Sequence, residues 1–128
     1  MSKSSVKVKL AMAQALAIFM DSGASSATIT FYEGVQPASP EAAADPAKAL
    51  VTLEFPEPCF KEATASYVEL FPTDTAIVTK TGTTTWARIY NGLGEAVADL
   101  SVGADITLAN TNLALGGLFQ VNSFKIRP

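Results

Sequence analysis

The sequence contains no histidine and only one cysteine among its 128 residues. Histidine is the commonest general base and a frequent ligand of transition metals, so its absence excludes most nucleophilic triads and most such metal sites. A single cysteine excludes an intrachain disulfide and leaves too few ligands for a structural zinc site. Glycine-rich phosphate-binding motifs are also missing. We therefore expect that the protein is not an enzyme and carries no cofactor.

Charged residues are scarce as well, at 16% of the chain against an average of about 25%. Nine basic and twelve acidic residues give a net charge of −3, and the only basic grouping is Lys3, Lys7 and Lys9. Binding to nucleic-acid phosphates needs clustered Lys and Arg, so we expect no direct contact with DNA or RNA. A surface this poor in charge suits an ordinary β domain with a Thr-rich exterior, or a protein that packs against neighbours.

Carboxylate and amide side chains are the remaining candidates for chemistry. Two carboxylate pairs are conceivable as acid and base, Glu54 with Glu57 and Asp99 with Asp105, and the nearest set of calcium ligands is Asp105, Asn110 and Asn112. Solvated surface groups explain the pairs more simply, and turns explain the Asx residues. Cys59 lies in the apolar segment Phe55–Phe60, which predicts a buried, unreactive thiol in a protein made in a reducing compartment.

Residues 1–24 allow two interpretations. Three lysines, the apolar stretch Leu10–Met20 and the small residues that follow resemble a secretory signal peptide. An amphipathic helix is the preferred interpretation, because apolar residues recur at three- and four-residue spacing and Gly23 is placed to end it. The residues predicted to form its inner face are Val6, Leu10, Ala13, Ala17 and Met20, with Leu16 beside them. The stretch is too short to span a bilayer, so we expect no membrane segment.

The segment Thr81–Val102 predicts a β-hairpin, around which the rest of the chain is arranged. Thr83–Tyr90 and Glu95–Val102 are the strands, and Asn91–Gly94 is a loop whose glycines can adopt positive φ. Both faces of the first strand carry apolar area, so another part of the chain or another subunit should cover its second face. That face, with Trp86, Arg88 and Tyr90, is predicted to be covered by the N-terminal helix or, alternatively, to form an interface patch.

Alternating apolar residues predict further strands, separated by signals from Gly, Pro and Asn. They are Ala27–Glu33, Ala49–Phe55, Ala63–Leu70, Thr75–Lys80, Asp105–Leu108, Asn112–Leu115 and Leu118–Ile126, and a long loop at 35–47 has one predicted helical turn at Glu41–Ala44. About eight short strands predict a mainly β protein, an antiparallel β-sandwich or jelly roll with one N-terminal α-helix. We expect residues 1–128 to form one domain, with 1–24 as helix or arm and 27–128 as the β-rich body.

The order of these motifs resembles a family of small bacteriophage and prophage structural proteins found among head-assembly genes. The matching segments are Ile29–Gly34, Ala49–Phe55, Thr81–Tyr90, Gly94–Val102, Ala104–Leu108 and Val121–Ile126. The resemblance covers nearly the whole chain after residue 28, and it is a pattern of strands and turns with no catalytic signature. Its most distinctive parts are the step Trp86-Ala87-Arg88 and the pair Asp99 and Asp105. The family often has a longer turn between Val102 and Asp105.

The resemblance implies a virion protein, a head decoration or cement protein on the capsid exterior that is synthesised in the bacterial host cytoplasm. Its partners would be the major capsid protein and sister copies in a homo-oligomer, reached through the N-terminal helix and the Gly34–Lys48 loop. A tail component, as a tube or terminator subunit, is the first alternative. A carbohydrate-binding adhesin module is the second, and it would need exposed aromatic residues of which Trp86 is the main candidate.

Overall fold

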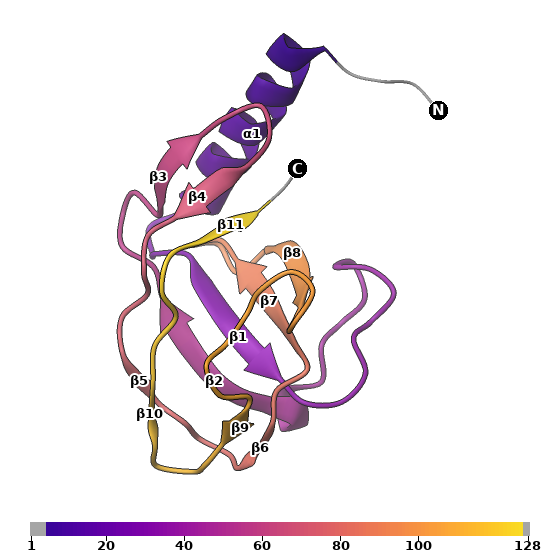
Figure 1. Cartoon of the computed structure of the whole chain (residues 1–128), viewed down its shortest axis with the longest axis vertical. Helices are drawn as coiled ribbons and strands as arrows, with labels where there is room; N and C mark the ends of the chain where they lie inside the picture. Colours follow the sequence, from indigo (N-terminus) through magenta and orange to yellow (C-terminus); the bar gives the residue numbers. More distant parts are fainter. Residues whose placement is uncertain (1–4, 127–128) are drawn as a thin grey trace.

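The computed structural model describes residues 5–126 and is mainly β, with four antiparallel sheets and one N-terminal helix (Figure 1). This agrees with the predicted sandwich class. Its elements are α1 (Val6–Met20), β1 (Thr28–Tyr32), the 3₁₀ turn η1 (Pro46–Lys48), β2 (Ala49–Glu54), β3 (Phe60–Ala63), β4 (Val68–Leu70), β5 (Ala76–Ile77), β6 (Gly82–Thr83), β7 (Trp86–Tyr90), β8 (Ala96–Ser101), β9 (Asn112–Leu113), β10 (Leu118–Phe119) and β11 (Phe124–Ile126).

The largest sheet has the order β2-β1-β7-β8 and contains the predicted hairpin as its β7–β8 pair. The predicted strand Thr83–Tyr90 is wrong as one strand, because Thr83 belongs to β6, which pairs with β9 in another sheet, and β7 begins only at Trp86. Ile29 lies opposite both Leu53 and Ile89 in the register of the sheet, so these three buried side chains share one face. Alternation along the strands places polar and aromatic residues on the other face. The sheet therefore has an apolar inner face and a mixed outer face.

Shorter strands form the second layer of the fold, in sheets of order β11-β4-β3, β10-β5 and β6-β9. Phe119 of β10 meets Phe31 edge to face, with ring centroids 5.2 Å apart. Phe124 of β11 packs against Phe55, with centroids 6.1 Å apart. Burying a Phe side chain contributes roughly 1.5–3 kcal/mol, so these contacts between layers are a main source of stability.

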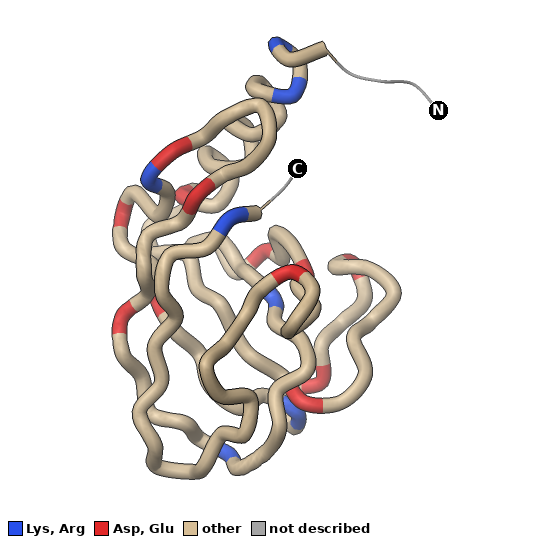
Figure 2. Tube along the Cα trace, in the orientation of Figure 1, with Lys and Arg blue, Asp and Glu red and all other residues tan. Residues whose placement is uncertain are grey.

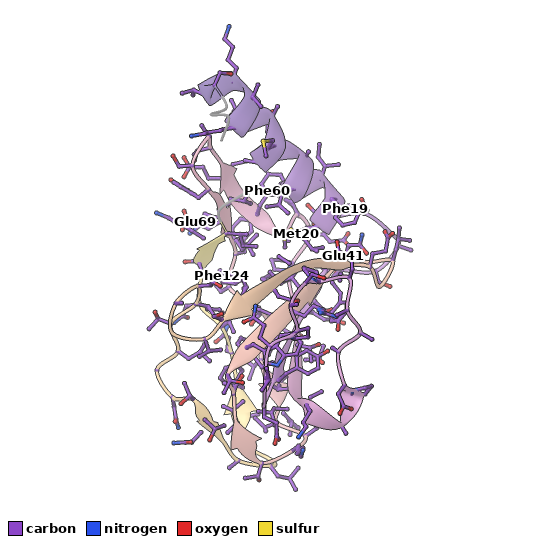
Figure 3. The ribbon with its side chains drawn as sticks, turned by 90° about the vertical axis from the view of Figure 1, so that its right-hand side faces the viewer. Phe19, Met20, Glu41, Phe60, Glu69 and Phe124 are labelled. Carbon is purple, nitrogen blue, oxygen red and sulfur yellow. The ribbon has the colours of Figure 1, made fainter. Side chains whose placement is uncertain are left out.

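Ser5 caps the N-terminus of helix α1, and its hydroxyl accepts a hydrogen bond from the Val8 amide at 3.2 Å. The helix packs against β3, β4 and β8, and Met20 and Phe60 lie where it meets the body (Figure 3). Of the predicted inner face, Ala13, Ala17 and Met20 are buried and Leu10 and Leu16 are half-buried. The prediction that Val6 lies on the inner face is wrong. Val6 is 71% exposed, because the N-terminal turns of α1 extend beyond β3 and β4 (Figure 1). Among residues 5–126, no helix combines the length and apolar character that crossing a bilayer requires.

The hairpin loop uses its two glycines differently from the prediction. Gly94 has φ +81°, the left-handed conformation expected there, whereas Gly92 does not appear among the glycines with positive φ. A Cβ on Gly92 would overlap the Ser25 carbonyl oxygen and lie 2.7 Å from that of Ser22. Gly92 is therefore needed for close approach to the segment after α1, to which its amide donates a 2.8 Å hydrogen bond at the Ser22 carbonyl.

Several predicted strands are shorter or divided. Ala63–Leu70 is wrong as one strand, because Thr64 Oγ1 accepts from the Ser66 and Tyr67 amides and closes a turn between β3 and β4. Leu118–Ile126 is also divided, into β10 and β11. Between them, the Val121 amide donates to Thr73 Oγ1 at 3.0 Å, which diverts the chain from the neighbouring sheet.

The remaining differences concern loops. The predicted helical turn at Glu41–Ala44 is wrong, and the helical turn lies further on, at η1, after its cap Asp45. Asp105–Leu108 is not a named strand, and only Ile106 forms an isolated bridge to Val102. Thr75–Lys80 and Asn112–Leu115 each shrink to two-residue strands, β5 and β9.

Candidate interaction surfaces

The outer face of β7 is covered by the loop between β1 and β2. Arg88 is 3% exposed, and its guanidinium donates to the carbonyl oxygens of Ala42 at 2.7 Å and Ser39 at 3.4 Å. It also binds Asp99 on β8 through Nε–Oδ1 at 2.6 Å and Nη2–Oδ2 at 3.1 Å. The expected cover by α1 is therefore wrong. Instead of α1, the Gly34–Lys48 loop covers the outer face of β7, and the hydrogen bonds of Arg88 join this loop to the sheet.

The aromatic residues of this face are also engaged within the chain. Trp86 is 2% exposed and stacks on Tyr32, with centroids 4.4 Å apart. The Tyr32 and Tyr90 hydroxyls share a hydrogen bond of 2.7 Å, and burial followed by this bond raises the pKa of Tyr32. The alternative of an exposed interface patch is wrong for Trp86 and Arg88. A buried Trp86 also removes the main aromatic residue of a sugar-stacking platform.

Most of the acidic and amide residues considered from the sequence have structural contacts. Asp99 is paired with Arg88, whereas Asp105 Oδ2 accepts from the Ser101 amide at 2.8 Å. Asn110 accepts from the Asn112 amide, and Asn112 accepts from the Thr83 hydroxyl. Glu54 and Glu57 are exposed. Within residues 5–126, no cluster of three or more acidic or thiol side chains is arranged to hold a metal ion.

Cys59 is fully buried, as predicted. Its amide donates to Asp21 Oδ1 at 3.0 Å, which ties the C-terminal cap of α1 to the start of β3. Burial, and then the nearby Asp21 carboxylate, raise the pKa of the Cys59 thiol far above its usual range. The thiol therefore stays protonated in the folded protein and is a poor nucleophile.

Three large apolar side chains are exposed at the end of the molecule farthest from α1, and we call them the distal tip: Ile77, Leu115 and Leu118. Their exposed fractions are 60%, 67% and 75%. Ile77 of β5 and Leu118 of β10 are directly paired across strands, so they share one face. Both strands lie near the lower end of the view in Figure 1. The sequence pattern predicts strands at these residues but not their exposure, because exposure depends on what the second layer leaves uncovered.

A second exposed apolar surface lies at the opposite end, on the side of α1 that faces away from the body. We call it the outer stripe: Val8, Ala11, Met12, Ala15, Ile18 and Phe19. The large side chains among them are 48% (Val8), 49% (Met12), 68% (Ile18) and 39% (Phe19) exposed. Adjoining apolar residues exposed to this extent mark contact surfaces more often than solvent-facing ones. The molecule thus has an apolar surface at each end of its long axis.

A shallow hollow separates the free edges of β8 and β11. Its volume is about 660 Å³, and it is lined by Asp99, Leu100, Asp105, Phe124 and other residues of these segments. Figure 3 shows two of the residues that line the hollow, Phe124 and Glu69. Lys and Arg residues are scattered along the chain and do not gather at the hollow (Figure 2). Three acidic residues line it, and two of them are already engaged, Asp99 with Arg88 and Asp105 with the Ser101 amide, whereas Glu69 is the third.

Comparisons with protein-family models, with curated proteins and with solved structures found no match to this chain. The resemblance to phage structural proteins is therefore carried by the sequence motifs alone. The geometry adds two apolar surfaces at opposite ends of a β-rich body, and the function has to be argued from these surfaces.

Proposed function

We propose that this chain is a structural protein of a bacteriophage virion, a decoration or cement protein on the outside of the head. In this proposal its partners are the major capsid protein and sister copies. The observation that carries the proposal is the distal tip, a fixed apolar surface at the end of the body. The side chains of Asp99, Asp105, Asn110 and Asn112, which were candidates for chemistry, are engaged in structural contacts, and this favours binding to other surfaces over a reaction.

The distal tip is held in place by backbone hydrogen bonds. The Val78 amide donates to the Gly117 carbonyl oxygen at 2.8 Å, and the Gly116 amide donates back to Val78 at 2.9 Å. The Leu115 amide donates to Thr81 Oγ1 at 2.9 Å. A surface already fixed before binding loses little conformational entropy when it docks, so more of its contact energy appears as affinity.

A decoration protein has to distinguish the assembled shell from free subunits. A ligand that binds only the assembled state stabilises that state by mass action. A shell has many identical sites, and each small protein bound to one of them adds to the stability of the shell. Contacts between sister copies strengthen the binding of each copy. A compact protein with one surface for the shell and another for a neighbour meets these requirements.

Co-sedimentation with purified heads tests the proposal. We expect saturable binding to assembled heads and none to unassembled capsid protein. Equal binding to both forms, or binding to neither, would refute a decoration role. Rings or tubes of the pure protein in negative-stain images would indicate the tail component instead, and specific hits on a glycan array would indicate the adhesin module.

A further inference from the structure

Helix α1 is apolar on two opposite faces. Ala13, Ala17 and Met20 pack on the body. At 100° per residue, the outer stripe occupies the opposite side of the helix, and all six of its members are apolar. Lys7 and Gln14 lie on the flank between the two faces, whereas Lys9 lies on the inner side of the helix, between Leu16 and Met20 in helical angle. A helix that is apolar on both faces is typical of one that is buried on both.

We propose that the outer stripe binds the same stripe of a second copy of this chain, so that two α1 helices form an antiparallel pair about a two-fold axis. Val8, Ala11, Ala15 and Ile18 follow the alternating three- and four-residue spacing of a coiled-coil seam. This set is symmetric about residue 13, with large residues at its ends and alanines at its centre. In an antiparallel pair, Val8 packs against Ile18 of the second copy and Ala11 against its Ala15, so the helices approach closely.

The charges of α1 select the antiparallel direction. Lys7 and Lys9 lie near its N-terminus, its first turn has no acidic residue, its last turn has no basic residue, and Asp21 caps its C-terminus. This is the reverse of the arrangement that the helix dipole favours. Antiparallel pairing places Lys7 near the negative C-terminal end of the second copy's helix. Parallel pairing would place the Lys7 side chains of the two copies at the same end.

The shape of the molecule leaves room for this pairing. The N-terminal turns of α1 extend beyond β3 and β4, and the body lies at the C-terminal end of the helix (Figure 1). Because the outer stripes meet, the two bodies lie on opposite sides of the helix pair. Such a two-fold contact is closed and does not continue into a filament. The pairing specifies the contact between sister copies that the proposed function includes, and it can be tested without heads.

Disulfide trapping tests the register. In the proposed pair, residue 8 faces residue 18 of the second copy, whereas the two copies of residue 8 are about 15 Å apart along the axis, beyond the reach of a disulfide. We expect that mixing Val8→Cys with Ile18→Cys under mild oxidation gives a mixed disulfide dimer, and that Val8→Cys alone gives none. Efficient cross-linking of Val8→Cys alone, or no cross-link in the mixture, would overturn the antiparallel register. The wild-type chain, with its buried Cys59, is the control.

Light scattering of the pure protein tests the pairing itself. We expect a dimer whose dissociation constant rises at least about tenfold in Ile18→Glu, with no change in Gln14→Glu on the flank of the same helix. Near-ultraviolet circular dichroism of the buried Trp86 verifies that both variants are folded. A wild-type protein that remains monomeric at every concentration would overturn the proposal. Light scattering uses the pure protein without heads, so its result is independent of the co-sedimentation test. A monomer that binds heads would refute only the pairing, and a dimer that does not bind heads would refute only the decoration role.

Discussion

Arg88 and Asp99 are cross-strand partners in β7 and β8 and form a buried ion pair with two hydrogen bonds. Their side chains are 3% and 4% exposed. The bond to Asp99 raises the pKa of Arg88, so the guanidinium stays charged. Because it also donates to Ala42 and Ser39, one side chain joins two strands to the long loop.

Replacing Arg88 with Met should destabilise the fold by about 3–5 kcal/mol, because Asp99 would be left buried without its partner. Urea unfolding at neutral pH measures the change. Lys80→Met is the matched control, since Lys80 and Glu33 form an ion pair of 3.0 Å with side chains 45% and 26% exposed. We expect it to cost under about 1 kcal/mol. Equal losses in the two variants would contradict the role given to Arg88.

Gly92→Ala should cost more stability than Gly94→Ala. The new Cβ at position 92 would meet the backbone of the segment at Ser22–Ser25, which cannot move without displacing the end of α1. Overpacking of this kind costs about 1–3 kcal/mol or more. At position 94 nothing lies within 4 Å of the new Cβ, so only the left-handed conformation is penalised, by about 1–2 kcal/mol. Thermal unfolding ranks the two variants, and the opposite order would contradict the close approach.

Cys59 should make the protein less stable in alkali. The unfolded thiol ionises near pH 8.5, whereas burial raises the pKa of the folded thiol well above that value. Above pH 8.5 the unfolded state therefore binds fewer protons, and stability falls as pH rises. We expect a loss of about 1 kcal/mol between pH 8 and pH 9.5 in urea unfolding, and a smaller slope in Cys59→Ala. Identical slopes would show that the thiol does not contribute.

The distal tip should matter for binding and not for folding. Leu118→Ser and Ile77→Ser change exposed side chains, so we expect unfolding free energies within about 0.5 kcal/mol of wild type. Their affinity for heads should fall at least about tenfold. Leu93→Ser is the control, because Leu93 is 65% exposed on the hairpin loop, outside the distal tip. Loss of head binding in this control alone would place the contact elsewhere.

Local sequence signals predicted the elements that depend on local chemistry. The β7–β8 hairpin, β1, β2 and the helix follow from apolar periodicity and from the turn at Asn91–Gly94. The turn at Thr64 could have been recognised too, because Thr and Ser often close such turns with their hydroxyls. The break before β11 could not, since it depends on Thr73, which is remote from Val121 in the chain.

The surfaces were harder to predict than the strands. The strand pattern places Arg88 beside Trp86 and Tyr90 on one face, but it cannot show that the carbonyl groups of Ser39 and Ala42 lie over it. Val6 follows the helical periodicity of the inner face and is nevertheless exposed, because the body ends before the helix does. Exposure of the distal tip and the outer stripe depends in the same way on which elements the fold brings alongside them.

The heat stability of DNA-filled heads, measured as the temperature at which they release DNA, tests the central claim most directly. Saturating wild-type protein should raise this temperature, because it binds the assembled shell and not the free subunits. Leu118→Ser at the same concentration should raise it less, and Leu93→Ser should match wild type. Heads that bind the wild-type protein to saturation yet release DNA at an unchanged temperature would contradict a cement function.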